Sequence, residues 1–523
     1  MGKSEPLSNV DAAWLGMETP TNLMMVTGIL TFKEPLNVSD IQNVLNKRLL
    51  KFDRFKQRII QSKLPFAAPY WQDDPTFNIN AHVHRLALPT PGDQKALQEL
   101  VSDLMSTPLD FTKSPWQMHI IENYGKGCAL IVRLHHAIAD GMALIYVLLS
   151  LTDMTPEASL HHPEVEKTAE PSHSLPGGML GAWIQQTANT LRTSRRITQR
   201  IVQESTAAVR EPSRLSDLAA KGTDIALTTG RVVFRSPDPP TIFRGKLTVA
   251  KRATWSQPLR LKDVKAIKKI TGTTINDVLI AAMVGGLRSY LVGRGEEVEG
   301  LNFRAVVPVN LRKEHEIGTL GNKFGLVYLS LPVGIADPFD RLQEVHRRMN
   351  QLKNTPEAAV AIGILNAMGM SPMEVRSQSV SMFANKATAV MTNVPGLPIP
   401  LYLAGKQIDQ IMFWAPQAGG VALGISILSY AGKVYLGINT DAGLIPDPDT
   451  IIEGFYSEFD ALLDLVEQVK PTKAKFTKKT KKPVKQQQDD PDRCHAVTQS
   501  GSRCRNRSLD HSHYCHIHTE RKN

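Results

Sequence analysis

The stretch of sequence that decides the fold is Cys128–Gly141, CALIVRLHHAIADG. Its first half, from Ala129 to Leu134, is an apolar run typical of a buried strand, and it leads directly into His135 and His136. A strongly apolar pattern that predicts a helix follows over 142–151. Because neighbouring residues of a strand point to opposite faces, one histidine can face a cleft at the strand end while the other packs inward.

The residue types in this stretch indicate acid–base chemistry. An imidazole that titrates near neutral pH can remove a proton from a hydroxyl or an amine, as general-base acyl transfer requires. Asp140 lies four residues after His136, at a turn that Gly141 permits, and we expect it to hold that turn by pairing with an arginine from elsewhere in the chain. The alternative is a pair of core or surface histidines before a turn, which is at least as common for an isolated His-His pair.

Short apolar runs alternate with helical patterns on both sides of this stretch. In the first part of the chain we expect strands over 24–32, 116–122 and 128–134 and helices over 38–51 and 96–106. In the second part we expect helices over 261–270, 275–291, 338–352 and 451–469 and strands over 303–309, 326–332, 425–430 and 433–439. The layout predicts a mixed α/β (α+β) protein built as two halves.

Shifts in composition divide the chain further. The first half covers 1–155, a Pro-rich linker with an amphipathic helix near 179–205 covers 156–240, and the second half covers 241–469. A Lys-, Thr- and Gln-rich stretch over 470–491 predicts a solvated tether, and a Cys/His module follows over 492–520.

Composition and charge exclude several classes of protein. The 523 residues are 42% hydrophobic and 21% charged, which is enough for two or three domain-sized cores and argues against a disordered or collagenous chain. The net charge of +11 is concentrated at the end, where residues from Lys470 onward include 14 Lys and Arg against 5 acids, leaving about +2 for the main body. The charge of the body therefore gives no reason to expect nucleic acid as a partner.

Cysteine usage and apolar runs indicate a reducing, cytoplasmic setting. Cys128 stands alone, and the other three cysteines lie close together in the basic tail, which argues against a secreted disulfide framework. The first nine residues show no signal-peptide pattern. The longest uncharged run, 410–432, has the length of a membrane span, but Pro416 and four glycines divide it into strand-like pieces. We expect no transmembrane helix, although the body can rest on a membrane.

The motif His135-His136-x3-Asp140-Gly141 resembles the active-site signature of the coenzyme-A-dependent acyltransferase superfamily. Further motifs, in chain order, are LSNVDAAW (7–14), PLD (108–110), PWQMH (115–119), INDV (275–278), VPVNLR (307–312), LGNKF (320–324), TNVPG (392–396) and SYAG (429–432). Taken together they resemble the wax ester synthase/diacylglycerol acyltransferase family. The stretch 240–245 matches the family only loosely, and Asn310 stands where the family usually has serine, so the acceptor preference stays open.

The resemblance implies two chloramphenicol-acetyltransferase-like halves around a central tunnel, with His136 at its middle. In that picture His136 takes the proton of a diacylglycerol or fatty-alcohol hydroxyl, which attacks the thioester of acyl-CoA without a catalytic cofactor. His135, Asp140 and Gly141 complete the motif. The resemblance also implies that Asn276 stabilises the oxyanion; the alternative is that Asn276 only caps the following helix. Cys128, inside the strand, is expected to be a buried small hydrophobe.

The tail predicts a metal site. Cys494, Cys504, Cys515 and His518 supply three thiols and an imidazole, a set that suits tetrahedral zinc, with further histidines nearby. The alternative is a disordered basic tail with incidental cysteines. The Lys-rich tether is expected to attract anionic lipid headgroups, so a membrane or lipid-droplet surface is the expected peripheral partner, beside acyl-CoA and the acceptor lipid.

Two other functions fit parts of the sequence. One is an enzyme of the same fold that uses a non-lipid alcohol or an amine as acceptor. The other is a catalytically silent scaffold whose metal-binding tail recognises a partner.

Overall fold

The structure is a computed structural model that describes residues 4–61, 68–157, 228, 230–312, 316, 318–353, 355, 357–370, 379–380, 382–476, 494–496, 504, 506–508 and 512–515. The helix expected near 179–205 and most of the predicted linker lie outside the described residues. The chain up to Glu467 belongs to one compact unit and the chain from Gln468 to a second. The strands of all three described sheets lie in the first unit.

The stretch that ends at the histidines forms the middle of a mixed sheet. The strand order is β13-β14-β2-β7-β6-β5. The bounds are β2 Met25–Phe32, β5 Val83–Leu86, β6 Trp116–Tyr124, β7 Gly127–His135, β13 Tyr402–Leu403 and β14 Lys406–Trp414. β7 pairs antiparallel with both β2 and β6, and this central position explains its nearly continuous apolar sequence. The three strands expected in the first part of the chain are confirmed.

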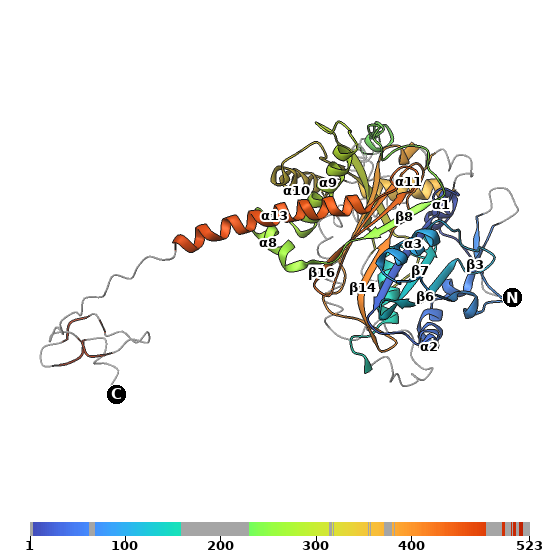
Figure 1. The fold of residues 1–523 in the computed structure, drawn as a ribbon, viewed down its shortest axis with the longest axis horizontal. Helices are drawn as coiled ribbons and strands as arrows, with labels where there is room; N and C mark the ends of the chain where they lie inside the picture. Colours follow the sequence, from blue (N-terminus) through green and yellow to red (C-terminus); the bar gives the residue numbers. More distant parts are fainter. Residues whose placement is uncertain are drawn as a thin grey trace, which may run out of the picture. The chain divides into compact units, whose positions relative to one another are not determined.

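Two strands of this sheet come from the second part of the sequence. β14 pairs antiparallel with β2, with Ile411 opposite Leu30, and Figure 1 shows it beside the strands of the first half. The uncharged run 410–432 forms part of β14 and all of β15, Leu423–Tyr430, as Pro416 and the four glycines predict. Because β14 covers the edge of β2, the two halves share a sheet.

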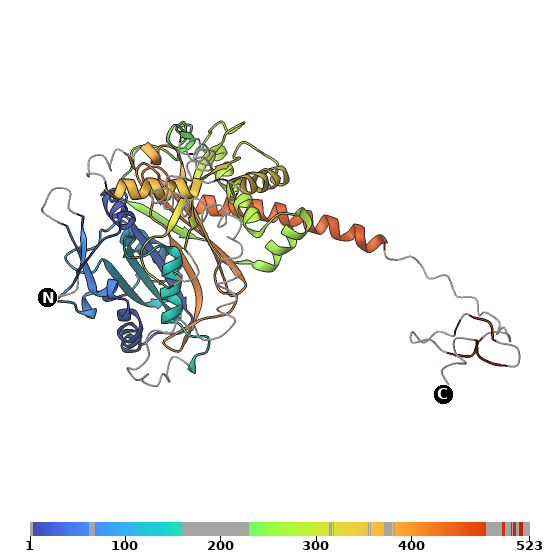
Figure 2. The same ribbon diagram turned by 180° about the vertical axis from the view of Figure 1, so that it is seen from behind.

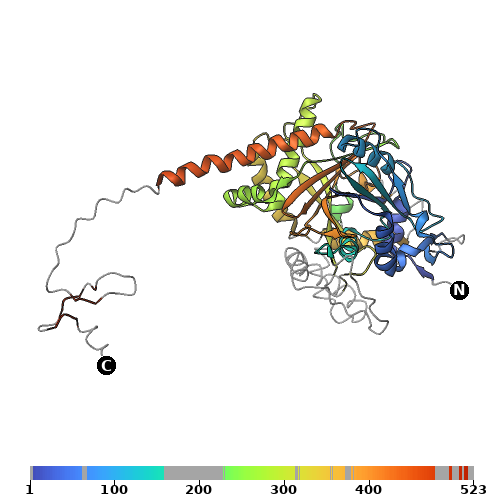
Figure 3. The same ribbon diagram turned by 60° about the horizontal axis from the view of Figure 1, so that its bottom comes forward.

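The second sheet has the order β11-β10-β12-β15-β16-β8, with the short β9 also paired to β16. Its strands are β8 Lys251–Trp255, β9 Leu259–Arg260, β10 Phe303–Asn310, β11 Phe324–Leu331, β12 Ala389–Val394, β15 Leu423–Tyr430 and β16 Lys433–Asp441. β12 is parallel to both β10 and β15, whereas the other pairs are antiparallel. Figure 3 shows the strands β14 and β16 between the helices of the second half and the elements of the first. A third, small sheet has the order β1-β4-β3, with β1 Ser4–Pro6, β3 Gln57–Ile60 and β4 Tyr70–Asp73.

One described helix, α9 (Ile275–Gly293), is long and apolar enough to cross a bilayer by length and composition. Most of its residues are buried in the hydrophobic core of the second half. Gly286 allows this helix to approach α13 (Asp449–Phe476), since a Cβ there would lie 2.8 Å from the carbonyl oxygen of Ile451. α9 therefore packs as the central helix of a globular half.

The predicted helices that fall on the described residues are present, and some of their ends differ from the prediction. They are α2 Val38–Arg48, α3 Gln94–Met105, α4 Gly141–Leu151, α8 Leu261–Thr271, α9, α10 Pro338–Lys353 and α13. The last turn of the helix expected over 38–51 is a 3-10 turn, Leu49–Lys51. α13 continues through Lys470 to Phe476, where a tether was expected; Lys and Ala favour the helix there, although the segment contains Pro471.

Helix α1 (Asn9–Met17) connects the start of the chain to the site. It packs against α11 (Glu357–Met370), and Figure 2 shows the two helices side by side. Val10 and Trp14 of α1 join Leu365 of α11 in one buried apolar cluster. α1 is thereby held where its inner face reaches the histidine motif.

Candidate active site

The histidine motif forms a tight loop between β7 and α4. The His136 N–H donates to the carbonyl of Met24 (2.7 Å), and the Ile138 N–H donates to that of His135 (3.0 Å). α4 begins at Gly141, and Asp140 is its N-cap, with Oδ1 accepting from the Ala143 N–H at 3.0 Å. Asp140 therefore fixes the point at which the loop becomes a helix.

The second carboxylate oxygen of Asp140 binds the arginine that the sequence predicted without identifying. Arg312 Nη2 donates to Asp140 Oδ2 at 2.7 Å, and the Lys323 N–H donates to the same oxygen at 2.9 Å. The side chains of Arg312 and Asp140 are only 3% and 5% exposed. Arg312 also donates to the carbonyls of Thr319 and Gly321. The ion pair therefore holds the motif loop against a segment of the second half.

His135 points into the protein. Its Nδ1 accepts from the Ala137 N–H at 3.1 Å, so the ring proton is on Nε2, which lies 3.2 Å from Glu18 Oε2. The same carboxylate oxygen accepts from the Met24 N–H at 3.1 Å. Phe111 packs edge-on against the ring. These contacts make His135 a buried support of the loop.

His136 lies on the opposite side of the loop from His135, and 7% of its surface is exposed. Its ring stacks on Trp14, with centroids 4.4 Å apart and planes 18° apart, and Phe324 lies 5.7 Å away. Burial lowers the pKa of His136, and the charge of Asp140 offsets this shift only in part. The imidazole is therefore neutral at pH 7, the state in which it can accept a proton.

Asn276 lies in the first turn of α9 and is not its cap. Thr274 is the N-cap: its hydroxyl accepts from the Asp277 N–H (3.2 Å), and the Asp277 carboxylate accepts from the Thr274 N–H (2.9 Å). The alternative of a capping Asn276 is therefore wrong. Asn276 Oδ1 instead accepts from Asn393 Nδ2 at 2.5 Å. None of the hydrogen bonds described for Asn276 reaches His135 or His136.

Three residues near His136 had no role in the sequence analysis, namely Trp14, Asp11 and Asn322. The signal that could have found them is their place in the LSNVDAAW and LGNKF motifs. Cys128, in contrast, is as expected: it is 1% exposed, its thiol donates to the carbonyl of Glu34, and burial raises its pKa to about 11.

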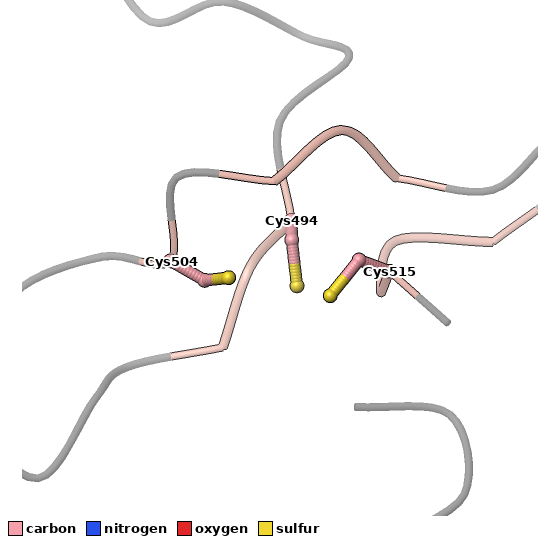
Figure 4. A group of neighbouring side chains, drawn as sticks. All are labelled: Cys494, Cys504 and Cys515. Carbon is pink, nitrogen blue, oxygen red and sulfur yellow. The ribbon is translucent and has the colours of Figure 1, made fainter. Parts of the chain in front are cut away.

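The tail brings its three cysteines together. The sulfurs of Cys494, Cys504 and Cys515 all lie within 4.8 Å of one another, and Figure 4 shows them pointing towards a common centre. The Cys494 N–H donates to the carbonyl of Asn506 and the Cys504 N–H to that of Ala496. The fourth predicted ligand, His518, lies outside the described residues. Three converging thiols suit a soft divalent metal such as zinc.

The mixed α/β fold and a buried His-His-x3-Asp-Gly loop at the end of β7 are what a coenzyme-A-dependent acyltransferase requires. Family models of the wax ester synthase/diacylglycerol acyltransferase catalytic domain and of the WS/DGAT C-terminal domain match residues 7–279 and 320–463. The chain belongs to this family. It is an O-acyltransferase that moves a fatty acyl group from acyl-CoA to diacylglycerol or a long-chain alcohol.

Individual relatives are consistent with this family assignment. A Mycobacterium tuberculosis protein named "Probable diacylglycerol O-acyltransferase tgs1" is 28% identical over 436 residues, which cover 82% of this chain and 89% of that protein. The solved wax ester synthase/diacylglycerol acyltransferase of Marinobacter aquaeolei VT8 is 20% identical, with a TM-score of 0.62 over 88% of this chain and 99% of that one. The first condensation domain of the calcium-dependent antibiotic synthetase shares the fold at 13% identity, with a TM-score of 0.57 over 89% and 96% of the two chains. The family assignment excludes the catalytically silent scaffold.

The buried ion pair predicts a stability effect. Arg312→Met leaves the Asp140 carboxylate buried without its cation, so we expect the free energy of unfolding to fall by about 3–5 kcal/mol, measured by chemical denaturation. Arg85→Met, which breaks the exposed Arg85–Glu122 pair, is the control and should cost at most about 1 kcal/mol. Equal, small losses in the two variants would contradict the importance of the buried pair.

Proposed function

We propose that His136 is the general base of the acyl transfer. Nδ1 of His136 is buried and takes part in none of the hydrogen bonds described for the protein. Nε2 is therefore the ring nitrogen that can accept a proton from the substrate. The proposal rests on one observation: the imidazole of His136 is neutral and lies in a loop that Asp140 holds in place.

The reaction then needs no covalent acyl-enzyme intermediate. Nε2 of His136 takes the proton of the acceptor hydroxyl while the hydroxyl oxygen forms a bond to the thioester carbon. The tetrahedral intermediate collapses with cleavage of the C–S bond, and the leaving thiolate takes the proton from Nε2 to give free coenzyme A. The stacked ring of Trp14 and the nearby Phe324 restrict water around His136, which disfavours hydrolysis of the thioester.

The oxyanion of that intermediate needs a donor, and we propose Asn276 for this role. Since Asn276 Oδ1 accepts from Asn393, the amide nitrogen of Asn276 is left to donate. Asn393 thus orients the Asn276 side chain. A preorganised donor of this kind contributes when negative charge develops on the carbonyl oxygen.

Substituting the base tests this function. His136→Ala should lower kcat by about 10²–10⁴-fold, and Asn276→Ala by about 10²-fold, with acyl-CoA and either dodecanol or diacylglycerol, followed as thiol release. Because burial lowers the pKa of His136 below its usual 6.5, kcat/KM of the wild type should hold its neutral-pH value at pH 6 and fall only at lower pH.

The control is His84→Ala, a half-buried histidine of β5 outside the motif, which should leave kcat unchanged. Turnover by His136→Ala at the wild-type rate, or a profile whose midpoint lies at pH 6.5 or above, would contradict the role of His136.

We also propose that Cys494, Cys504, Cys515 and His518 hold a structural zinc ion. The described core of the tail consists of the three cysteines with Ala496 packed against them. So small a core cannot stabilise a fold by itself, whereas a metal that links three segments can. Zinc would supply this cross-link, with His518, three residues after Cys515, as the remaining ligand.

Metal content tests this site. The full chain should contain about one zinc per molecule, as a closed four-ligand site requires, and Cys504→Ser should lose it. Cys128→Ser is the matched control because that thiol lies alone in β7. Acyl transfer should be unaffected by either tail substitution or chelation. Equal zinc in wild type and Cys504→Ser would refute the assignment.

We propose, finally, that the enzyme works on a membrane or lipid-droplet surface. Its substrates are lipids, the residues from Lys470 onward include 14 Lys and Arg against 5 acids, and Phe234 and Met370 are 87% and 69% exposed. Each basic residue near an anionic surface contributes about 1 kcal/mol.

Vesicle binding tests the contribution of the tail. The full chain should cosediment with phosphatidylserine-containing vesicles more than with phosphatidylcholine vesicles, and added salt should release it because the attraction is electrostatic. A chain that ends at Val469 should lose this preference and keep its turnover of acyl-CoA. Undiminished binding of the shortened chain to anionic vesicles would disprove a role for the tail.

A further inference from the structure

Asn322 connects the carbonyl of His136 to a buried carboxylate. Its Nδ2 donates to the His136 carbonyl oxygen at 2.8 Å and to Asp11 Oδ1 at 2.7 Å, and its own N–H donates to the same Asp11 oxygen at 3.2 Å. Both neighbours of the amide group are acceptors, so its NH₂ must face them and the orientation of the side chain is chemically defined. Asp11 and Asn322 are each 5% exposed.

Both residues are themselves held in place. Asp11 lies in the first turn of α1, where its N–H donates to the hydroxyl of the N-cap Ser8 at 3.1 Å, and a carboxylate near a helix N-terminus is favourably placed. Asn322 follows Gly321, whose N–H donates to the Ile138 carbonyl at 3.1 Å. The bridge therefore spans α1, the motif loop and the segment before β11.

α1 interacts with His136 in two ways, one direct and one through Asn322. Trp14, one turn after Asp11, stacks on the face of the imidazole, and Asp11 acts through Asn322 on the carbonyl of the same residue. The hydrogen bond from Asn322 fixes the backbone from which the ring of His136 projects, and the stacked Trp14 limits rotation of that ring. Together the two contacts restrict the direction in which Nε2 points.

We infer that Asn322 and Asp11 are positioning residues for His136, which fix its backbone carbonyl and thereby aim Nε2 at the acceptor hydroxyl. The inference rests on the proposed role of His136 as the base. Asp11 holds the amide of Asn322, and Asn322 holds the carbonyl. Neither residue takes or gives a proton in the reaction, so their loss should slow the chemical step and leave substrate binding unchanged.

Steady-state kinetics of the full-length chain test the inference. Asn322→Ala removes both side-chain bonds and should lower kcat by about 10–100-fold at unchanged KM for acyl-CoA and acceptor, as expected for a misaligned base. Asp11→Ala should have a similar effect, whereas Asp11→Asn keeps an oxygen that can accept from Asn322 and should restore kcat to within about threefold of wild type. The double alanine variant should be no slower than Asn322→Ala, because the residues act in series.

A matched control separates positioning from stability. Asn123 of β6 also makes two side-chain hydrogen bonds, to the N–H and the carbonyl of Leu88, and Asn123→Ala should lower the unfolding temperature without changing kcat. If Asn322→Ala and Asp11→Ala lose stability only and keep kcat within twofold, as Asn123→Ala does, the inference is wrong. Wild-type turnover in His136→Ala would instead overturn the proposed function, so the two failures are distinguishable.

Should Asn322→Ala fail to fold, the Asp11→Ala and Asp11→Asn pair still decides the question. Equal kcat in these two variants would mean that acceptance from Asn322 does not matter and would also overturn the inference.

Discussion

The ion pair between Arg312 and Asp140 is the contact on which the site depends. Both side chains are almost fully buried, so breaking the pair would leave a lone charge in the protein interior at a cost of several kcal/mol. Asp140 also caps α4, and Arg312 also binds the carbonyls of the segment that follows it. One interaction thus joins the end of the histidine loop, the start of α4 and a segment of the second half.

His136 lies where these constraints meet. β7 supplies the rigid strand, α1 supplies the stacked Trp14, and the segment held by Arg312 supplies Asn322 against the carbonyl. The same burial lowers the pKa of His136 and leaves its imidazole neutral at pH 7. Trp14 and Phe324 pack beside the ring, so one packing arrangement sets both the charge and the apolar surroundings of the imidazole.

The shared sheet makes the two halves one structural unit. Without β14 the edge of β2 would be open, so the first sheet is completed only after the chain has passed through most of the second half. The tail differs from the first unit because its described part has almost no apolar core. Its three cysteine sulfurs lie close together instead. The first unit is thus held together by its shared sheet, whereas the described part of the tail is held together by contacts among its cysteines.

The sequence alone determined the features that depend on near neighbours. Periodicity predicted most strands and helices within a few residues, and the spacing of His135, His136 and Asp140 predicted the loop and its need for an arginine. The alternative that Asn276 caps α9 is wrong, because Thr274, two residues earlier, is the N-cap and forms a capping box with Asp277. The end of the last helix was misplaced because Lys-rich sequence suits a helix as well as a tether.

Only the tertiary structure decided which distant groups meet. Arg312 is 172 positions from Asp140, Asn322 is 186 from His136 and 311 from Asp11, and β14 pairs with a strand near the other end of the chain. A local sequence pattern predicts contacts between residues that are a few positions apart in the chain. A contact between residues this far apart depends on the order of the strands in the sheets. Any of the chain's arginines could have neutralised Asp140 by charge alone, and the fold brought Arg312 to it.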